Sequence, residues 1–272
     1  YLGAIQAFSP YQPDYLEIAT DSDGVIPESL DEVLAGNEVA LVYLVPTFQN
    51  PTGRTVPLER RMRIAEIIRR RGVLLVEDDP YGALRFRGEP VPPIASLAPE
   101  HVVYVSTLSK VFAPGLRIGV AVVPGELRDW LVIAKQGVDL HTSTFNQALA
   151  AEYITGGFLA EQVPRIIEIY RPKQELMMRA LAEDFPDGFT WSQPDGGMFV
   201  WVEGPAGFDM DGVYARSVAA GAAFVPGKYF FTKPGAGGAT MRLNFTTAEP
   251  DELSRAIAII GAAIETELVS SP

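Results

Sequence analysis

Four runs of aliphatic residues recur along the first half of the chain, separated by more polar segments. They are VALVYLVP at 39–46, VLLVED at 73–78, VVYVST at 102–107 and IGVAVVP at 118–124. Each run is apolar at odd and even positions alike, which is typical of strands that helices cover on both faces. The pattern therefore predicts a mainly parallel sheet.

The segment between the first two runs, TVPLERRMRIAEIIRRRG, predicts a helix. Pro57 lies in its expected first turn, and three arginines precede a stop at Gly72. Proline near the start, glycine just past the end and basic residues in the last turn are typical of helix termini. The apolar face predicted for this helix consists of Leu58, Met62, Ala65 and Ile68. Strand, helix and strand together form a βαβ unit.

The second half of the chain has a different pattern. A long helical region at 144–183 carries two expected interruptions, at Gly156-Gly157 and around Pro164. The segment GFTWSQPDGGMFVWVEG then alternates like two paired strands around a glycine turn. A helix near 209–221, the strand TMRLNFTT and a closing helix follow. The apolar face of the closing helix consists of Leu253, Ile257, Ile260 and Ile264.

These patterns predict two domains of different architecture. Residues 1–160 are expected to form part of a large α/β domain, in which helices cover a mainly parallel sheet. Residues 161–272 are expected to form a smaller α+β domain. At 272 residues and 47% hydrophobic content, the chain is long enough and apolar enough for a substantial core.

Composition narrows the possible functions. The chain has 22 Lys+Arg against 34 Asp+Glu, so its net charge of -12 argues against a nucleic-acid surface in this segment. It has no cysteine, which excludes disulfides and thiol chemistry and favours the cytoplasm, and with only two histidines we expect no metal site. The longest apolar stretch, AIAIIGAAI, is about half the length that a membrane span requires.

Chemically useful side chains follow three of the predicted strands. PTFQNPTG (46–53) offers an amide, DDPYG (78–82) a carboxylate and a phenol, and LSK (108–110) a lysine beside hydroxyls. In open parallel sheets, ligands bind beyond the carboxyl ends of the strands, because the loops converge there. We therefore expect these groups to share one site.

Such a set of groups suits an aromatic aldehyde that carries a phosphate. Lysine forms a Schiff base with the aldehyde, and a hydroxyl pair with an arginine holds the phosphate. A carboxylate facing a pyridine nitrogen keeps that nitrogen protonated, so the ring can accept electrons from a carbanion. At about 4 Å and an effective dielectric constant near 20, this pairing is worth roughly 4 kcal/mol. The residues therefore predict pyridoxal 5'-phosphate as the cofactor.

Four motifs occur in an order that resembles a known family. PTFQNPTG, VEDDPYG, STLSKVFAPGLRIG and MRLNFTTA together are similar to the motifs of fold-type I pyridoxal-phosphate aminotransferases of class I/II. The residues within these motifs are similar to those of the branch that contains 2-aminoadipate aminotransferases and the aminotransferase-like domains of MocR-type regulators. The resemblance covers nearly the whole chain and implies the fold-type I architecture, a cytoplasmic homodimer and a role in amino-acid metabolism.

The resemblance also implies roles for single residues. Lys110 would form the internal aldimine and, once the substrate has released it, move the proton from the substrate's α-carbon to C4' of the cofactor. Asp78, three residues before Tyr81, would pair with the pyridine nitrogen. Tyr81 and Asn50 would bind the 3'-oxygen of the cofactor.

The remaining implied roles concern the phosphate and the substrate. Thr107, Ser109 and Arg117 would hold the phosphate, with Thr107 standing where the family more often has serine. Arg242 would bind the substrate's α-carboxylate, assisted by Asn50. The substrates implied are an α-amino acid and a 2-oxo acid, with glutamate and 2-oxoglutarate as a natural pair. Aminoadipate, branched-chain, aromatic and acidic donors stay open.

Two other functions remain compatible with these residues. A MocR-type regulator would keep the lysine and the cofactor but use the domain as a sensor, with a DNA-binding domain upstream. A pyridoxal-phosphate-dependent lyase would share the same cofactor residues.

Family members are longer at the N-terminus and carry a glycine-containing phosphate loop and a ring-stacking aromatic residue there. Because neither is recognisable in this chain, the large domain is expected to be N-terminally incomplete and, alone, to bind cofactor poorly.

Overall fold

The computed structural model describes residues 1–270 and divides into two compact units, which are treated in turn. The parallel-sheet unit comprises Leu16–Thr47 and Thr55–Ile167. The antiparallel-sheet unit comprises Tyr1–Tyr15, Phe48–Arg54 and the chain from Glu168 onward. The domain boundary expected between residues 160 and 161 stays a prediction. No helix within residues 1–270 is both long enough and apolar enough to span a membrane.

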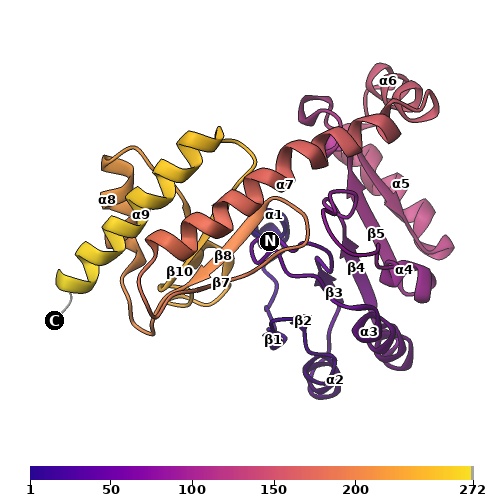
Figure 1. The fold of residues 1–272 in the computed structure, drawn as a ribbon. Helices are drawn as coiled ribbons and strands as arrows, with labels where there is room; N and C mark the ends of the chain where they lie inside the picture. The colour runs from indigo at the N-terminus through magenta and orange to yellow at the C-terminus, as the bar shows by residue number, and fades with distance from the viewer. Residues whose placement is uncertain (271–272) are drawn as a thin grey trace. The chain divides into compact units, whose positions relative to one another are not determined.

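The sheet of the parallel-sheet unit has the strand order β3-β4-β5-β6. Figure 1 labels β3, β4 and β5 of this sheet. Its strands are β3 (Leu41–Leu44), β4 (Leu74–Asp78), β5 (Val102–Thr107) and β6 (Gly119–Val122). β3, β4 and β5 run parallel, whereas β6 pairs with β5 antiparallel. All four expected strands are confirmed. The sheet is mixed at one edge because the connection at 108–118, which contains two 3₁₀ turns, returns the chain beside β5 without a crossover helix.

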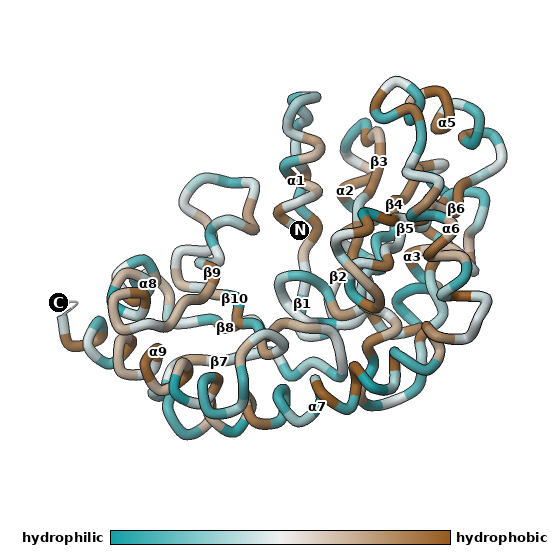
Figure 2. Tube along the Cα trace, turned by 90° about the horizontal axis from the view of Figure 1, so that it is seen from above, coloured by the Kyte–Doolittle hydropathy of each residue, from teal (hydrophilic) through white to brown (hydrophobic). Residues whose placement is uncertain are grey.

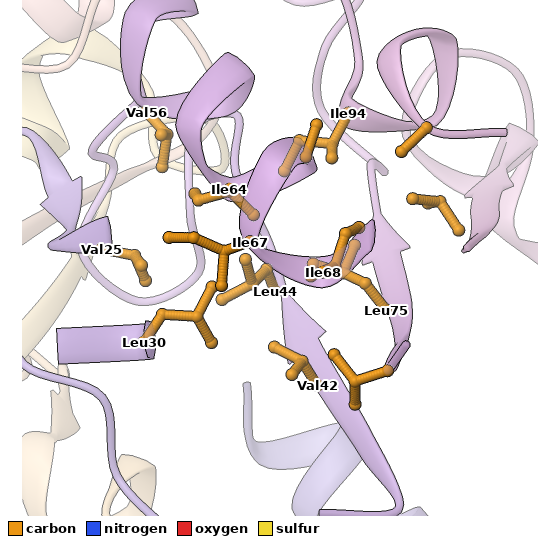
Figure 3. Packing of buried hydrophobic residues seen from close by; sticks show 14 residues of the cluster. Val25, Leu30, Val42, Leu44, Val56, Ile64, Ile67, Ile68, Leu75 and Ile94 are labelled. Atoms are coloured by element: carbon orange, nitrogen blue, oxygen red, sulfur yellow. The ribbon is translucent and has the colours of Figure 1, made fainter. Parts of the chain in front are cut away.

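The other elements of this unit surround the sheet. They are β1 (Thr20–Asp21), β2 (Gly24–Val25), α2 (Pro27–Gly36), α3 (Leu58–Arg71), α4 (Ile94–Leu97), α5 (Gly125–Asp139), α6 (Thr144–Thr155) and the first part of α7 (Phe158–Asp184). Val42, Leu75 and Val102 are in register across β3, β4 and β5, so their side chains share one face. Leu30 of α2 and Ile68 of α3 pack against that face (Figure 3).

Helix α3 has the predicted limits but a different buried face. Gly72 ends it in the left-handed conformation at φ 66°, as expected, while Pro57 lies just before its first residue. Leu58 and Met62, expected in the core, are 42% and 56% exposed. Arg61 is instead among the buried residues. Ala65 and Ile68 are buried as expected, so the prediction is wrong only for Leu58 and Met62. A buried arginine occupies a position that simple patterning assigns to the surface.

Arg61 is 1% exposed and donates hydrogen bonds to two loops, the β3–α3 loop and the loop before α4. Its guanidinium contacts the carbonyls of Pro46 at 3.0 Å, Val56 at 2.8 Å and Pro92 at 3.1 Å. Its Nη1 atom lies 4.0 Å from Oε1 of Glu77, which is fully buried in β4. Burial raises the pKa of Glu77, while backbone N–H donors of α4 and the Arg61 charge oppose that rise. The pair and its hydrogen bonds thus join the β3–α3 loop to the loop that precedes α4.

The sheet of the antiparallel-sheet unit has the strand order β7-β8-β10-β9. Its strands are β7 (Thr190–Trp191), β8 (Phe199–Glu203), β9 (Val225–Pro226) and β10 (Thr240–Asn244), and its helices are α1 (Leu2–Phe8), α8 (Met210–Ala219), α9 (Pro250–Ser270) and the later part of α7. The expected pairing of β7 with β8 is confirmed. The two-residue strand β9 is not predicted by the sequence pattern.

The helices of this unit largely follow the expected pattern. Hydrophobic and hydrophilic positions alternate along α9 (Figure 2). Its four expected core residues are buried. Helix α7 begins after the Gly156-Gly157 break, as expected, but continues unbroken past Pro164 to Asp184. The interruption expected at Pro164 is therefore wrong. Pro164 is exposed, and so is Ala160, whose carbonyl loses its helical partner and can be hydrated.

Replacing Arg61 with methionine is expected to lower the free energy of unfolding by about 3–5 kcal/mol, because the buried Glu77 carboxylate then lacks its countercharge. Denaturant-induced unfolding of the wild type and the variant measures this loss. Arg63→Met, on the same helix but 44% exposed, is the matched control and should change stability by about 0.5 kcal/mol or less. A loss of under about 1 kcal/mol for Arg61→Met would contradict this account of the pair.

Candidate functional site

The eight candidate residues fall into two groups, one in each unit. The parallel-sheet unit holds Asp78, Tyr81, Thr107, Ser109, Lys110 and Arg117. The antiparallel-sheet unit holds Asn50 and Arg242. The first group follows the carboxyl ends of β4 and β5, as the sequence predicts.

Asp78 is the last residue of β4 and accepts a hydrogen bond from the Tyr43 phenol at 2.6 Å. Its carboxylate is half-buried. Burial raises the pKa of Asp78 above its ordinary value, the Tyr43 hydrogen bond lowers it, and the neighbouring Asp79 charge raises it. The carboxylate therefore lies in a partly dehydrated environment with a phenol as donor.

Asp79 forms the turn that follows β4, the loop role that its position suggests. One carboxylate oxygen accepts the backbone N–H of Gly82 at 2.8 Å, and the other accepts the Tyr104 hydroxyl at 3.1 Å. Tyr81, in the middle of this turn, is 3% exposed. The two adjacent aspartates thus have different surroundings: Asp79 closes the turn, and Asp78 remains on the strand.

Lys110 ends a 3₁₀ turn, Leu108–Lys110, that directly follows β5. Thr107 caps this turn: its Oγ1 atom accepts the Ser109 N–H at 3.1 Å and donates to the Ile118 carbonyl at 3.0 Å. The two hydroxyl oxygens of Thr107 and Ser109 lie 2.9 Å apart. The threonine therefore keeps the hydroxyl pair together and fixes the turn that presents the half-buried lysine.

Arg117 lies at the same end of the β5–β6 pair as this turn. Thr107 faces Gly119 across the antiparallel ladder, so Arg117, two residues before Gly119, extends past the end of the paired segment. Its backbone is left-handed at φ 55° and the residue is exposed. Asn146 of α6 donates to the Leu116 carbonyl at 3.1 Å and so ties the preceding residue to a helix.

In the antiparallel-sheet unit, Asn50 and Arg242 contact each other directly. Nη1 of Arg242, on β10, donates to Oδ1 of Asn50 at 2.8 Å. The guanidinium lies over the ring of Phe199 at 4.2 Å and over that of Phe230 at 5.1 Å. Asn50 is only 4% exposed. The two residues expected to act on one carboxylate thus form one hydrogen-bonded pair, and the aromatic rings fix the plane of the guanidinium.

The donor set of the parallel-sheet unit fits a phosphorylated pyridine aldehyde. It combines a lysine amine, a hydroxyl pair with a neighbouring arginine, and a carboxylate that a phenol holds. Among the described residues, no group of three or more histidine or acidic side chains could hold a metal ion.

The comparison with known families decides the assignment. The family described as aminotransferase class I and II matches residues 19–260. The chain belongs to this family. The match includes all eight candidate residues, and the predicted resemblance to these aminotransferases is confirmed.

Individual relatives support the same assignment. The aromatic-amino-acid aminotransferase 1 of Thermococcus litoralis is 43% identical over 98% of this chain, which spans 66% of that relative's length. LysN, the α-aminoadipate aminotransferase of Thermus thermophilus, solved with N-(5'-phosphopyridoxyl)-L-leucine, has a TM-score of 0.94 at 38% identity. The match covers 99% of this chain and 70% of that structure. A more distant relative, the HTH-type transcriptional regulator YdfD of Bacillus subtilis, is 29% identical over 99% of this chain and 55% of its own length.

These findings confirm three of the sequence predictions for the aminotransferase chain. They are the fold-type I α/β architecture, the aminotransferase assignment and pyridoxal 5'-phosphate as the cofactor. The chain spans about two thirds of the length of the relatives named for aromatic amino acids and 2-aminoadipate. The roles of the individual site residues stay predictions.

Sequence reasoning missed Tyr43 and Tyr104, the donors to Asp78 and Asp79. Each tyrosine lies within an otherwise aliphatic strand, in VALVYLVP and VVYVST. A phenol inside such a run needs a polar partner for its hydroxyl, so each tyrosine indicates that a polar group lies nearby. Which partner each phenol contacts depends on the register between the strands, which the sequence does not state.

Replacing Asp78 with asparagine is expected to leave the cofactor-free aminotransferase at least as stable as the wild type at pH 7. Because burial raises the folded-state pKa of Asp78, the folded protein binds this proton more tightly than the unfolded chain does. The contribution of this group to stability is therefore full below the unfolded pKa and is lost as the pH rises through the folded pKa. Thermal melts from pH 4 to pH 8 measure the difference.

The gap in Tm between Asp78→Asn and the wild type should close toward the acid end, where both side chains are neutral. The variant should also bind pyridoxal phosphate more weakly at every pH. A Tm below that of the wild type at pH 7, with a gap that does not change with pH, would contradict this account.

Proposed function

We propose that the protein transfers an amino group between an α-amino acid and a 2-oxo acid, with pyridoxal 5'-phosphate as cofactor and glutamate/2-oxoglutarate as one substrate pair. One observation carries the proposal: Lys110 and Asp78 follow the carboxyl ends of β5 and β4, which are adjacent and paired in register. The open parallel part of a sheet offers its ligand site at this edge. Membership of the aminotransferase family supports the same reaction class.

The lysine and the aspartate divide the chemistry between them. When bound, the cofactor supplies a ring that takes up the electron pair left as the substrate's α C–H bond breaks. Lys110 binds the aldehyde carbon through Nζ, and after the substrate has displaced it, Nζ moves the α-proton. The Asp78 carboxylate holds a proton on the pyridine nitrogen, and the Tyr43 hydrogen bond favours the charged form that this task requires.

The polar groups beside Lys110 hold the phosphate. Ser109 and Thr107 present two hydroxyls 2.9 Å apart, and Arg117 adds a permanent positive charge at the same end of β5 and β6. A phosphate accepts several charge-assisted hydrogen bonds and so suits this combination. Tyr81 would donate its phenol to the 3'-oxygen of the cofactor, and Asn50 would contribute its amide to the same oxygen.

Arg242 is the proposed ligand of the substrate's α-carboxylate. A guanidinium matches a carboxylate with two parallel N–H donors, which fixes the orientation of the substrate as well as its affinity. The contact with Asn50 at 2.8 Å and the two aromatic rings hold the guanidinium before substrate arrives. The relatives named for aromatic amino acids and for α-aminoadipate support donors of these two classes.

A cytoplasmic homodimer is part of the proposal. Helix α5 buries none of its residues in the described structure, and Trp130, Ile133 and Val138 on it are exposed. An apolar surface of this kind supports contact with a second chain. The absence of cysteine supports a reducing compartment, and the net charge of -12 supports small-molecule substrates over nucleic acid.

The similarity to YdfD supports a second candidate, the sensor domain of a MocR-type regulator. Such a domain would bind the same cofactor through Lys110 but would not turn over an amino acid. The two candidates therefore differ in what happens after the amino acid has bound.

The decisive experiment adds glutamate to the purified intact protein loaded with pyridoxal phosphate. The visible absorption band of the bound cofactor should disappear, and one 2-oxoglutarate should form per site; adding a 2-oxo acid should restore the band. Aromatic amino acids and 2-aminoadipate are tested in the same way. A band that no amino acid changes would favour the sensor, and release of ammonia with loss of the substrate's side chain would indicate a lyase.

Arg242→Gln serves as the specificity control for this reaction. Losing a charge-assisted contact with the carboxylate should raise KM for glutamate roughly 100-fold. Arg216→Gln removes another arginine of the same unit, one that pairs with Glu267 at 2.8 Å, and should leave KM unchanged. Equal effects of the two variants on KM would remove Arg242 from the substrate site.

A further inference from the structure

Tyr43 contacts the proposed site but belongs to none of its motifs. It lies in β3, in the strand interior, and its phenol O–H donates to Oδ2 of Asp78 at 2.6 Å. A separation this short is typical of a hydroxyl that donates to a charged oxygen. The contact joins two strands and ends at the carboxylate expected to serve the cofactor.

The strand register explains why these two side chains meet. Tyr43 is paired with Val76 across the parallel β3–β4 ladder, and Asp78 lies two residues beyond Val76. Side chains two residues apart on a strand share a face, so Tyr43 and Asp78 are diagonal neighbours on one face of the sheet. The opposite face carries Val42 and Leu75 and packs against α3. The Tyr43 phenol thus reaches Asp78 from outside the hydrophobic core.

We propose that Tyr43 is a positioning residue, which holds the Asp78 carboxylate in the ionised form and fixes its rotation so that its other oxygen, Oδ1, faces the pyridine nitrogen of the cofactor. This rests on the proposed function of Asp78. A carboxylate with one oxygen held by a phenol cannot rotate freely about its terminal torsion. Groups that orient a ligating side chain in this way affect affinity and activity without touching the ligand themselves.

Tyr104 and Asp79 provide a matched control within the same unit. Tyr104 is paired with Glu77 across β4 and β5, and Asp79 lies two residues beyond Glu77, so the diagonal geometry is the same on the opposite face. The Tyr104 hydroxyl donates to Oδ2 of Asp79 at 3.1 Å, while the other oxygen of Asp79 accepts the Gly82 N–H. The two tyrosines therefore make the same kind of contact, but only Tyr43 contacts the proposed cofactor ligand.

The test is a double-mutant cycle on cofactor affinity, measured by spectral titration of the intact cofactor-free protein with pyridoxal phosphate. Tyr43→Phe keeps the ring and should raise the cofactor Kd about tenfold. In the Asp78→Asn background the same change should alter the Kd by less than about twofold, because the group that Tyr43 positions is already lost. In turnover, kcat should fall about tenfold while KM for glutamate changes little.

Tyr104→Phe should leave both the cofactor Kd and kcat within about twofold of the wild type. Additive effects of Tyr43→Phe and Asp78→Asn on the Kd, or equal effects of the two tyrosine changes, would overturn the proposal. If the effects on the Kd are coupled but the protein transfers no amino group, the proposed function is refuted and the positioning role stands. Absence of cofactor binding by the wild type would overturn both the proposed function and the positioning role of Tyr43.

Discussion

The loops at the strand ends of the parallel-sheet unit are held by the guanidinium of Arg61, which is buried away from water. Arg61 comes from the first turn of α3, yet its hydrogen bonds go to carbonyls at both ends of the β3–α3 loop and in the loop before α4. A buried cation is tolerated only when its N–H groups are satisfied and a countercharge lies near, and here Glu77 supplies that charge. Because these loops carry the backbone around the strand ends, their conformations are linked through one side chain.

The alternation of side chains along one strand then gives three neighbouring carboxylates three different surroundings. Glu77 faces α3 and α4 and accepts the backbone N–H groups of Ile94 and Ala95. Asp78 faces the other side of the sheet, where Tyr43 holds it. Asp79 closes the following turn through Gly82. The alternation of side chains along β4 sends Glu77 and Asp78 to opposite faces, and the end of the strand leaves Asp79 in the turn.

Much of this arrangement was predictable from the sequence because it depends on local patterns. The strands, the end of α3 at Gly72 and the buried face of α9 follow from apolar periodicity and glycine chemistry. The order of the motifs indicated the family and the cofactor, which the comparisons confirm. Asp78 and Lys110 are predictable because Asp78 ends one apolar strand and Lys110 lies in the turn that follows the next.

The remainder depends on tertiary contacts that no local pattern states. The burial of Arg61 overrode the apolar face expected from Leu58 and Met62, because three carbonyls and Glu77 compensate its charge. Helix α7 continues past Pro164, because an exposed turn tolerates one missing hydrogen bond. The roles of Tyr43 and Tyr104 follow from the register of the strands, which a single sequence does not reveal. Each of these features requires knowledge of which residues face one another.

The central claim is that Lys110, presented by the turn after β5, is the residue that binds the cofactor covalently. The most direct measurement reduces the cofactor-loaded intact protein with borohydride and locates the phosphopyridoxyl group by peptide mass spectrometry. The account predicts one modified peptide, the one that contains Lys110. Label on Lys135, Lys173, Lys228 or Lys233 in its place, or no stable label on a protein that binds the cofactor, would contradict it.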